Sequence, residues 1–286
     1  MNLIDGKQIS AQIRKELADK AKELKDQTGI VPGLAVIIVG EDPASQIYVR
    51  NKAKACEELG FYSEVIRMSA DTTQSELEEL IDRLNENNKI HGILLQLPLP
   101  KNSEINESEI LLRISPKKDV DAFHPYNVGL ISIGDYGFLP CTPAGVMQLI
   151  ERSGIEVCGK SCVVIGRSNI VGKPMAMLLL NKSGTVTVCH SRTKNLKEIC
   201  ASADILVSAV GKAGFVTADM VKDGAVVIDV GMNRDANGKL CGDVAFDEVE
   251  KKASAITPVP GGVGPMTIAM LMRNTLTAAK MQNNIV

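Results

Sequence analysis

Tyr48 and Lys52, two residues able to take part in proton transfer, stand four positions apart in the stretch "YVRNK". If the segment 44–59 is a helix, both side chains lie on one face of it. A lysine acts as an acid or base near neutral pH only if its pKa falls from about 10.4 toward 7, which burial or a nearby cation favours. The spacing alone, however, favours a solvated basic face shared with Arg50 and Lys54.

Gln96 and Asp121 are further candidates for such a site. Gln96 interrupts the apolar stretch "LLQLPLP", and a buried amide needs hydrogen-bond partners. It could bond the backbone at a strand end, but strand ends of α/β sheets are also where ligands bind. Asp121 is the second aspartate of "KKDVDAF", and the simple interpretation is a turn residue that bonds its own backbone.

The stretch "GKSCVVIGRSNIVGKPMAMLLL" (159–180) has the order strand, glycine turn and helix. This order directs backbone N–H groups and a helix N-terminus at a phosphate. Gly166 would allow the tight turn, and Gly172 would permit close packing of helix and strand. The second glycine of the usual fingerprint is replaced by Ser168, and a plain turn between strand and helix is the alternative.

The end of the next expected strand indicates which dinucleotide would bind. It offers His190, Ser191 and Arg192 and no carboxylate. NAD-binding folds usually place an acidic residue here, where it bonds the ribose hydroxyls. With Arg167 in the preceding loop, these cations and hydroxyls suit a 2′-phosphate, so NADP is favoured over NAD. The alternative is that both arginines only contact solvent.

Helix-period segments alternate with short β-branched runs along the chain, which predicts parallel sheets covered on both faces. Thr73 with Glu76 three residues later is typical of a helix cap. Strands are expected at 34–40, 62–68, 92–100, 162–166, 185–190, 205–211 and 225–231. Helices are expected at 10–27, 44–60, 73–87, 142–154, 195–203 and 265–280. One more helix is expected after the strand "CVVIG" and ends at residue 183.

The loop-rich segment 114–140 separates two such series, so the sequence predicts an α/β protein of two domains. A length of 286 residues is compatible with that number. A cleft between the domains is the default place for a ligand.

Composition argues against several classes of partner. The net charge of −2, the absence of Trp and an aromatic content of 3% are unlike a nucleic-acid-binding protein. No apolar run approaches the ~20 residues of a membrane span, and the first residues lack a signal pattern, so a cytoplasmic protein is expected. Seven scattered cysteines and three histidines show no zinc-ligand spacing, so no metal site is expected and the thiols are expected to be reduced.

Longer motifs make the chain similar to the methylenetetrahydrofolate dehydrogenase/cyclohydrolase family. In the second half they are "CTPAG" (141–145), "GRSNIVGKP" (166–174), "DVGMNR" (229–234) and "TPVPGGVGPMT" (257–267). In the first half they are "SQIYVRNKAKACEELG" (45–60), "GILLQLPLP" (92–100) and "KKDVDAFHP" (117–125). The similarity follows the family's order along essentially the whole chain, and long motifs such as "TPVPGGVGPMT" are highly specific.

This resemblance implies oxidation of 5,10-methylenetetrahydrofolate with NADP, followed by hydrolysis of the methenyl product to 10-formyltetrahydrofolate, which would feed purine synthesis. It implies a folate domain of residues 1–138 plus 268–286 and a Rossmann-like NAD(P)-binding domain of residues 139–267. The two would flank one cleft. Members are typically homodimers, so the resemblance also implies a second copy as partner, with an interface through the second domain.

The resemblance also assigns roles to individual residues. Lys52 matches the family's catalytic lysine, and Tyr48 the aromatic residue that packs on the aminobenzoyl ring. Gln96 would orient Lys52. Asp121 would accept hydrogen bonds from the pterin. Contacts with the cofactor or with both ligands would come from Met232, Pro260, Gly261 and Gly262.

One departure from the family pattern lies beside Asp121. The family commonly has glycine where this chain has Ala122, and alanine tolerates positive φ less well. A small backbone shift could therefore lower the efficiency of pterin binding.

Three other functions share some of these features. A dehydrogenase with weakened cyclohydrolase activity is the first, and Ala122 is the one point in its favour. A nicotinamide sensor without turnover is the second. An amino-acid or shikimate-type dehydrogenase would have the same two-domain plan but would not be expected to contain "TPVPGGVGPMT".

Overall fold

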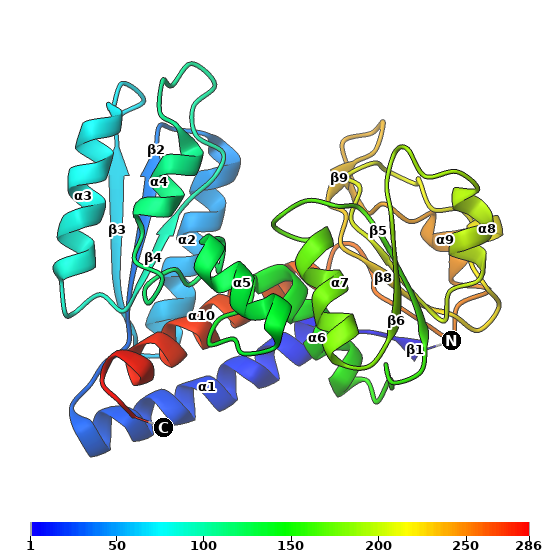
Figure 1. Ribbon diagram of the computed structural model, residues 1–286, viewed down its shortest axis with the longest axis horizontal. Coiled ribbons are helices and arrows are strands. Elements are labelled where there is room, and N and C mark those ends of the chain that lie inside the picture. Colours follow the sequence, from blue (N-terminus) through cyan, green and yellow to red (C-terminus); the bar gives the residue numbers. More distant parts are fainter. Residues whose placement is uncertain (1, 286) are drawn as a thin grey trace. The chain divides into compact units, whose positions relative to one another are not determined.

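The protein forms two compact units, which are described in a computed structural model for residues 2–285 (Figure 1). One unit combines the residues up to Ala11 with Pro140–Thr267, and the other combines Gln12–Leu139 with the residues from Ile268 onward. Two helices, α1 (Gly6–Thr28) and α10 (Val263–Gln282), contribute residues to both units.

The unit built around Gln12–Leu139 contains a three-stranded parallel sheet in the order β3-β2-β4. Its strands are β2 (Gly33–Val39), β3 (Tyr62–Met68) and β4 (Gly92–Leu95). All seven residues of β2 are buried, as expected for a central strand of β-branched and aliphatic residues covered on both faces. The chain leaves β2 for β3 on one side and later returns to β4 on the other, so β2 is the topological switch point.

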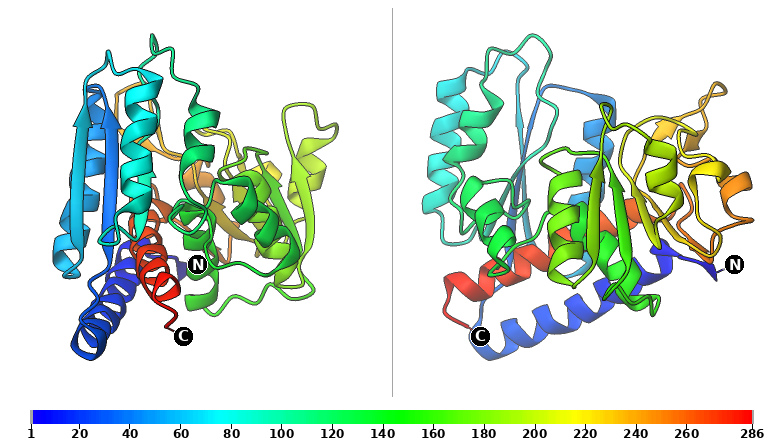
Figure 2. Two further views of the ribbon diagram at one scale, coloured as in Figure 1. Left: turned by 60° about the vertical axis from the view of Figure 1, so that its left-hand side comes forward. Right: turned by 45° about the vertical axis from the view of Figure 1, so that its right-hand side comes forward.

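Helices cover both faces of this sheet. Alternate residues of β2, namely Ala35, Ile37 and Val39, share an apolar cluster with α3 (Gln74–Glu86) and α4 (Glu107–Arg113). Helix α2 (Pro43–Glu58) lies on the opposite face from α3 (Figures 1 and 2).

The predicted cap of α3 is confirmed. Thr73 Oγ1 accepts a hydrogen bond from Glu76 N at 3.3 Å, and Glu76 Oε2 accepts one from Thr73 N at 2.8 Å.

The other unit contains a six-stranded parallel sheet in the order β1-β11-β8-β7-β5-β6. Its strands are β1 (Asn2–Leu3), β5 (Ser161–Ile165), β6 (Thr185–Cys189), β7 (Ile205–Ser208), β8 (Val226–Asp229) and β11 (Ala255–Ile256). The chain passes from β5 to β6 on one side and then to β7 on the other. Strand β5 is therefore the switch point of a doubly wound sheet.

Helices cover this sheet on both faces as well. Figure 1 shows α6 (Cys141–Arg152) and α7 (Gly172–Asn181) on one face, with α8 (Leu196–Ala201) and α9 (Phe246–Val249) on the other. A 3₁₀ turn, η1 (Ala218–Met220), completes the second layer, and β9 (Asn233–Arg234) pairs with β10 (Leu240–Cys241) as a small antiparallel ribbon.

The fold class is as predicted, but several details differ from the sequence-based expectation. The strand expected over 92–100 ends at Leu95, before the prolines at 98 and 100 that cannot donate ladder hydrogen bonds. The segment 114–140 is not loop throughout, because α5 (Pro125–Ile133) begins after His124, whose Nδ1 accepts a hydrogen bond from Tyr126 N. The compact units also place the first eleven residues differently from the predicted folate domain, since β1 pairs with β11.

Residues 2–285 contain neither a membrane-spanning helix nor a metal-binding group of side chains. No helix within residues 2–285 combines the length and the apolar character needed to cross a membrane. In the same range, no group of three or more His, Cys, Asp or Glu side chains is placed to hold a metal ion.

Candidate functional site

Lys52 meets Gln96 at the carboxyl end of the three-stranded sheet. Helix α2 directly follows β2, and its start is fixed by Asp42, whose Oδ2 accepts a hydrogen bond from Ser45 N at 2.7 Å. Gln96 is the residue after β4 and donates its backbone N–H to Ile37 O at 2.8 Å. From these positions Lys52 Nζ donates to Gln96 Oε1 at 2.8 Å.

The Gln96 amide is held by both of its ends. Its Nε2 donates to Leu97 O at 2.6 Å while its Oε1 accepts from Lys52. The carbonyl oxygen must therefore face the lysine, because an ammonium group offers only donors. The observed contact is the one expected of a residue that orients Lys52.

Exposure separates Lys52 from the neighbouring basic residues. Arg50 and Lys54 are exposed, whereas Lys52 is half-buried. Tyr48, one helical turn before Lys52, is 40% exposed and so has much of its ring open to a ligand. The interpretation as a solvated basic face, which the spacing alone favours, therefore fits Arg50 and Lys54 but not Lys52.

The loop that carries Asp121 is organised by a residue that the sequence analysis overlooked, Asp119. This carboxylate is 3% exposed and accepts hydrogen bonds from His124 N at 2.8 Å, Asn127 Nδ2 at 2.8 Å and Phe123 N at 3.3 Å. Burial raises the pKa of Asp119, and these hydrogen bonds oppose that rise. The motif gives no direct sign of this role, because Phe123 and His124 precede α5 and the residue that caps the helix is His124 itself.

Helix α10 supports the same loop from another side. Asn274 Nδ2 donates to Val120 O and to Leu139 O, each at 2.8 Å. The half-buried Asp121 thus follows a residue whose carbonyl is held in place.

Ala122 occupies the conformation that the sequence analysis identified as difficult for alanine. Its φ is +57° and its side chain is fully buried. A left-handed conformation costs a non-glycine residue about 1–2 kcal/mol. The departure from glycine therefore introduces local strain next to Asp121.

The glycine turn after β5 requires glycine at both predicted positions. Gly166 has a φ of +126°, and a Cβ there would lie 2.4 Å from Ala209 O. A Cβ on Gly172, in the first turn of α7, would lie 2.2 Å from Gly166 O. The turn therefore packs too tightly for a side chain at either position, and it lies at the switch point where doubly wound sheets bind dinucleotides.

Ser168 has a structural role inside this turn. Its Oγ accepts hydrogen bonds from Val171 N at 3.1 Å and Gly172 N at 3.3 Å. Its hydroxyl hydrogen can still be donated to a ligand. Arg167 beside it is exposed.

The turn after β6 places the other predicted cofactor residues. His190 N donates to Thr193 Oγ1 at 2.8 Å, and His190 Nδ1 accepts from Arg192 N at 3.2 Å. The acceptor role of Nδ1 leaves Nε2 as the protonated nitrogen of a neutral imidazole. Ser191 and Arg192 are exposed, and β6 is the direct neighbour of β5 in the sheet.

The last two predicted contact regions also belong to this unit. Met232 follows β8 and is 52% exposed. In the loop before α10, Pro260 is exposed, whereas Gly261 and Gly262 are buried. Gly261 has a φ of +112°, and its carbonyl accepts a hydrogen bond from Lys7 N at 3.1 Å.

Two buried aspartates near these loops, Asp229 and Asp243, were also overlooked by the sequence analysis. Asp229 ends the apolar run "AVVID", and a glycine follows two residues later. An acidic residue at the end of a buried strand is a signal that could have identified it.

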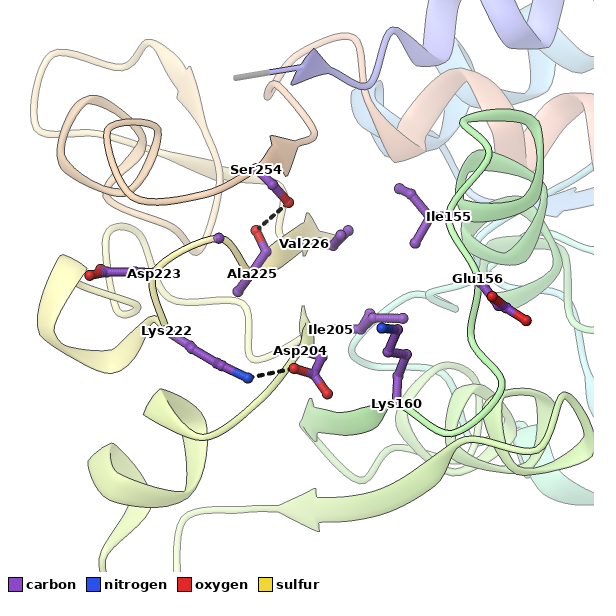
Figure 3. A pocket seen from close by; sticks show the side chains of 11 residues that line it. Ile155, Glu156, Lys160, Asp204, Ile205, Lys222, Asp223, Ala225, Val226 and Ser254 are labelled. Atoms are coloured by element: carbon purple, nitrogen blue, oxygen red, sulfur yellow. Dashed lines mark hydrogen bonds and ion pairs between the residues drawn. The ribbon is translucent and has the colours of Figure 1, made fainter.

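A hollow of about 360 Å³ lies at the opposite, amino end of the same sheet (Figure 3). It is lined by Lys160, which precedes β5, and by Ile205 and Val226, which begin β7 and β8. At its rim Lys222 Nζ contacts Asp204 Oδ1 at 2.6 Å. Parallel sheets bind ligands at their carboxyl ends, so this hollow is not the dinucleotide site.

The six-stranded unit has a doubly wound sheet with a glycine turn at its switch point, and the same chain contains a second α/β unit that carries Lys52. These features define a two-domain dinucleotide-binding protein. Comparison with known proteins agrees with this class. Residues 4–121 match the family model "Tetrahydrofolate dehydrogenase/cyclohydrolase, catalytic domain", and residues 140–283 match the corresponding "NAD(P)-binding domain". The chain belongs to the tetrahydrofolate dehydrogenase/cyclohydrolase family.

Individual relatives resemble the chain along nearly its whole length. It is 60% identical over 280 residues to Bifunctional protein FolD of Acetivibrio thermocellus, covering 98% of this chain and 97% of that protein. The bifunctional FolD methylenetetrahydrofolate dehydrogenase/cyclohydrolase of Campylobacter jejuni has a solved structure with a TM-score of 0.95 and 53% identity, with 99% of each chain covered. The Trypanosoma brucei enzyme, solved with NADP cofactor and an inhibitor, has a TM-score of 0.93 and 44% identity, with 98% of each chain covered.

The close approach at Gly172 leads to a first prediction. In Gly172→Ala the new methyl group must displace Gly166 O, so the turn shifts. We expect NADP⁺ affinity, measured by isothermal titration calorimetry, to fall about tenfold or more. Gly129→Ala is the control, because a Cβ there meets nothing within 4 Å. Wild-type affinity in Gly172→Ala would show that the turn does not shape the cofactor site.

Proposed function

We propose that this protein oxidises 5,10-methylenetetrahydrofolate to the methenyl compound with NADP⁺ and then hydrolyses that product to 10-formyltetrahydrofolate, with Lys52 as the acid/base group. Membership in the tetrahydrofolate dehydrogenase/cyclohydrolase family supports the pair of reactions. The observation that carries the assignment of Lys52 is its 2.8 Å hydrogen bond to Gln96.

The residues of the six-stranded unit fit NADP. Gly166 and Gly172 allow the turn after β5 to pack tightly between the strand and α7, and such a turn directs backbone N–H groups and a helix N-terminus at a pyrophosphate. Arg167, Ser191 and Arg192 are exposed and supply the cations and hydroxyl that suit a 2′-phosphate. When bound, the cofactor accepts a hydride from the methylene carbon. The Trypanosoma brucei relative was solved with NADP, which supports the same preference here.

We assign folate binding to the sheet that carries Lys52. Asp121 would accept hydrogen bonds from the donor groups of the pterin ring, and Tyr48 would pack on the aminobenzoyl ring. Met232, Pro260, Gly261 and Gly262 would contact the cofactor or both ligands, as the family resemblance implies. His190 and Ser168 complete the proposed cofactor set.

Hydrolysis of the methenyl group requires proton movement that Lys52 can supply. Water adds to the cationic carbon and loses a proton, and a ring nitrogen must then gain a proton before the bond to it breaks. An amine whose direction is fixed by Gln96 Oε1 can take the first proton and return it for the second step. A cationic substrate nearby favours the uncharged amine that this sequence needs.

A homodimer and a cytoplasmic location complete the proposal. The homodimer follows from the family resemblance, and the cytoplasmic location is compatible with the lack of a membrane-spanning helix within residues 2–285. Neither nucleic acid nor a membrane is proposed as a partner.

The role of Lys52 leads to a second prediction. Lys52→Gln removes the proton-transferring amine, so hydrolysis of methenyltetrahydrofolate, followed by loss of its absorbance, should fall about 100-fold or more. Lys54→Gln, an exposed lysine on the same helix, is the matched control and should stay within about twofold of wild type. Hydrolysis at the wild-type rate in Lys52→Gln would remove this residue from the mechanism. It would leave the dehydrogenase alternative, which Ala122 favours, as the better description.

The cofactor preference leads to a third prediction. Arg192→Ala should raise the KM for NADP⁺ about tenfold, because a charge-assisted contact with the 2′-phosphate is lost. The KM for NAD⁺, which lacks that phosphate, serves as the internal control and should change little. Equal changes in the KM for NADP⁺ and for NAD⁺ would show that Arg192 does not contact the 2′-phosphate.

A further inference from the structure

Two buried carboxylates, Asp229 and Asp243, have no part in the proposed chemistry. Asp229 is the last residue of β8 and is 3% exposed, and Asp243 follows β10 and is 0% exposed. A buried carboxylate costs several kcal/mol unless hydrogen-bond donors surround it. The donors around this pair therefore indicate what the two residues hold together.

Asp243 accepts four hydrogen bonds, two on each oxygen. Ser208 Oγ at 3.1 Å and Val210 N at 2.7 Å donate to Oδ2. Lys212 N and Asn233 Nδ2, each at 2.9 Å, donate to Oδ1. This number is about the full capacity of a carboxylate. A single side chain thus joins the segment leaving β7 to the segment leaving β8.

Asp229 in turn fixes the backbone of Asp243. Its Oδ1 accepts from Gly231 N and Asp243 N, and its Oδ2 accepts from Val244 N, all at 2.9 Å. Burial raises the pKa of Asp229 to about 6, while the three backbone donors oppose that rise. The Asp229 amide also donates to Thr257 Oγ1 at 2.8 Å, which anchors the pair to the end of β11.

Glycines allow the backbone to lie directly against both carboxylates. A Cβ on Gly231 would lie 2.2 Å from Asp243 Oδ1, and a Cβ on Gly242 would lie 1.9 Å from Asp229 Oδ2. Neither glycine has a positive φ, so the close approach is the reason that a side chain is excluded. A side chain at either glycine would therefore collide with one of the two carboxylates.

We infer that Asp243, supported by Asp229, is a positioning residue that sets the two loops holding the nicotinamide half of the cofactor. A dinucleotide in a doubly wound sheet crosses the carboxyl ends of the strands on both sides of the switch point. Segment 209–212 follows β7 and segment 230–233 follows β8 at that edge, and the half-exposed Met232 lies next to Asn233. The inference rests on the proposed NADP-dependent function.

This arrangement requires both oxygens of Asp243 as hydrogen-bond acceptors. In Asp243→Asn the shape is kept, but one oxygen becomes an NH₂ group that faces two donors. Two of the four hydrogen bonds are then lost and replaced by donor–donor repulsion. The loops after β7 and β8 must separate, whereas Lys52 and Gln96 belong to the other unit.

The test compares NADP⁺ binding with cofactor-free hydrolysis in purified full-length protein. For Asp243→Asn we expect the Kd for NADP⁺, by isothermal titration calorimetry, to rise about tenfold or more. Hydrolysis of methenyltetrahydrofolate supplied without NADP⁺ should stay within about twofold of wild type. Asp204→Asn is the control. It removes a carboxylate from the amino edge of the same sheet and should leave both quantities unchanged.

Two results would overturn the inference. One is wild-type NADP⁺ affinity in Asp243→Asn, and the other is a parallel loss of binding and hydrolysis in an Asp243→Asn protein that folds as the wild type does. If Asp243→Asn does not fold, Asn233→Ala removes one donor and leaves three, and wild-type affinity in that variant also overturns it. Failure of the proposed function is recognised separately, because the wild-type protein would then neither bind NADP⁺ nor hydrolyse the methenyl compound.

Discussion

The hydrogen bond between Lys52 Nζ and Gln96 Oε1 joins two positions 44 residues apart in the chain, and the proposed chemistry depends on it. It can form only because β2 and β4 are parallel neighbours. Their carboxyl ends then lie at one edge, where α2 begins and Gln96 follows β4. The strand order of the three-stranded sheet thus brings two distant sequence positions into one hydrogen-bonded pair.

The six-stranded unit uses the same geometric rule for a different purpose. Its glycine turn lies at the switch point β5, and the residues proposed to bind the cofactor follow β5, β6 and β8. Buried carboxylates hold the backbone behind the exposed residues in both units. Asp119 fixes the loop of Asp121, and Asp243 links the loops after β7 and β8. Each is surrounded by N–H donors, which offset the cost of burying its charge.

The parts of the fold that follow from local patterns of apolar and capping residues were predicted from the sequence. The apolar run of β2 and the Thr73 cap of α3 were predicted because their signals are local. The short strands β1 and β11 were not, because two-residue strands carry no pattern and form only through pairing between distant segments. The role of Lys52 was ambiguous by spacing alone, and its prediction as a catalytic residue came from the family resemblance. Asp119 and Asp243 were overlooked because their donors come from turns whose path the sequence does not specify, and Asp229 was overlooked although its place at the end of a buried strand was a local signal.

The most direct test of the central claim is the pH profile of methenyltetrahydrofolate hydrolysis in Gln96→Glu. A carboxylate 2.8 Å from Nζ would favour the charged ammonium form of Lys52. If an uncharged lysine starts the proton transfer, the rise of the rate with pH should move to higher pH by about one unit or more. A profile that keeps the wild-type position would contradict the assignment of Lys52 as the acid/base group.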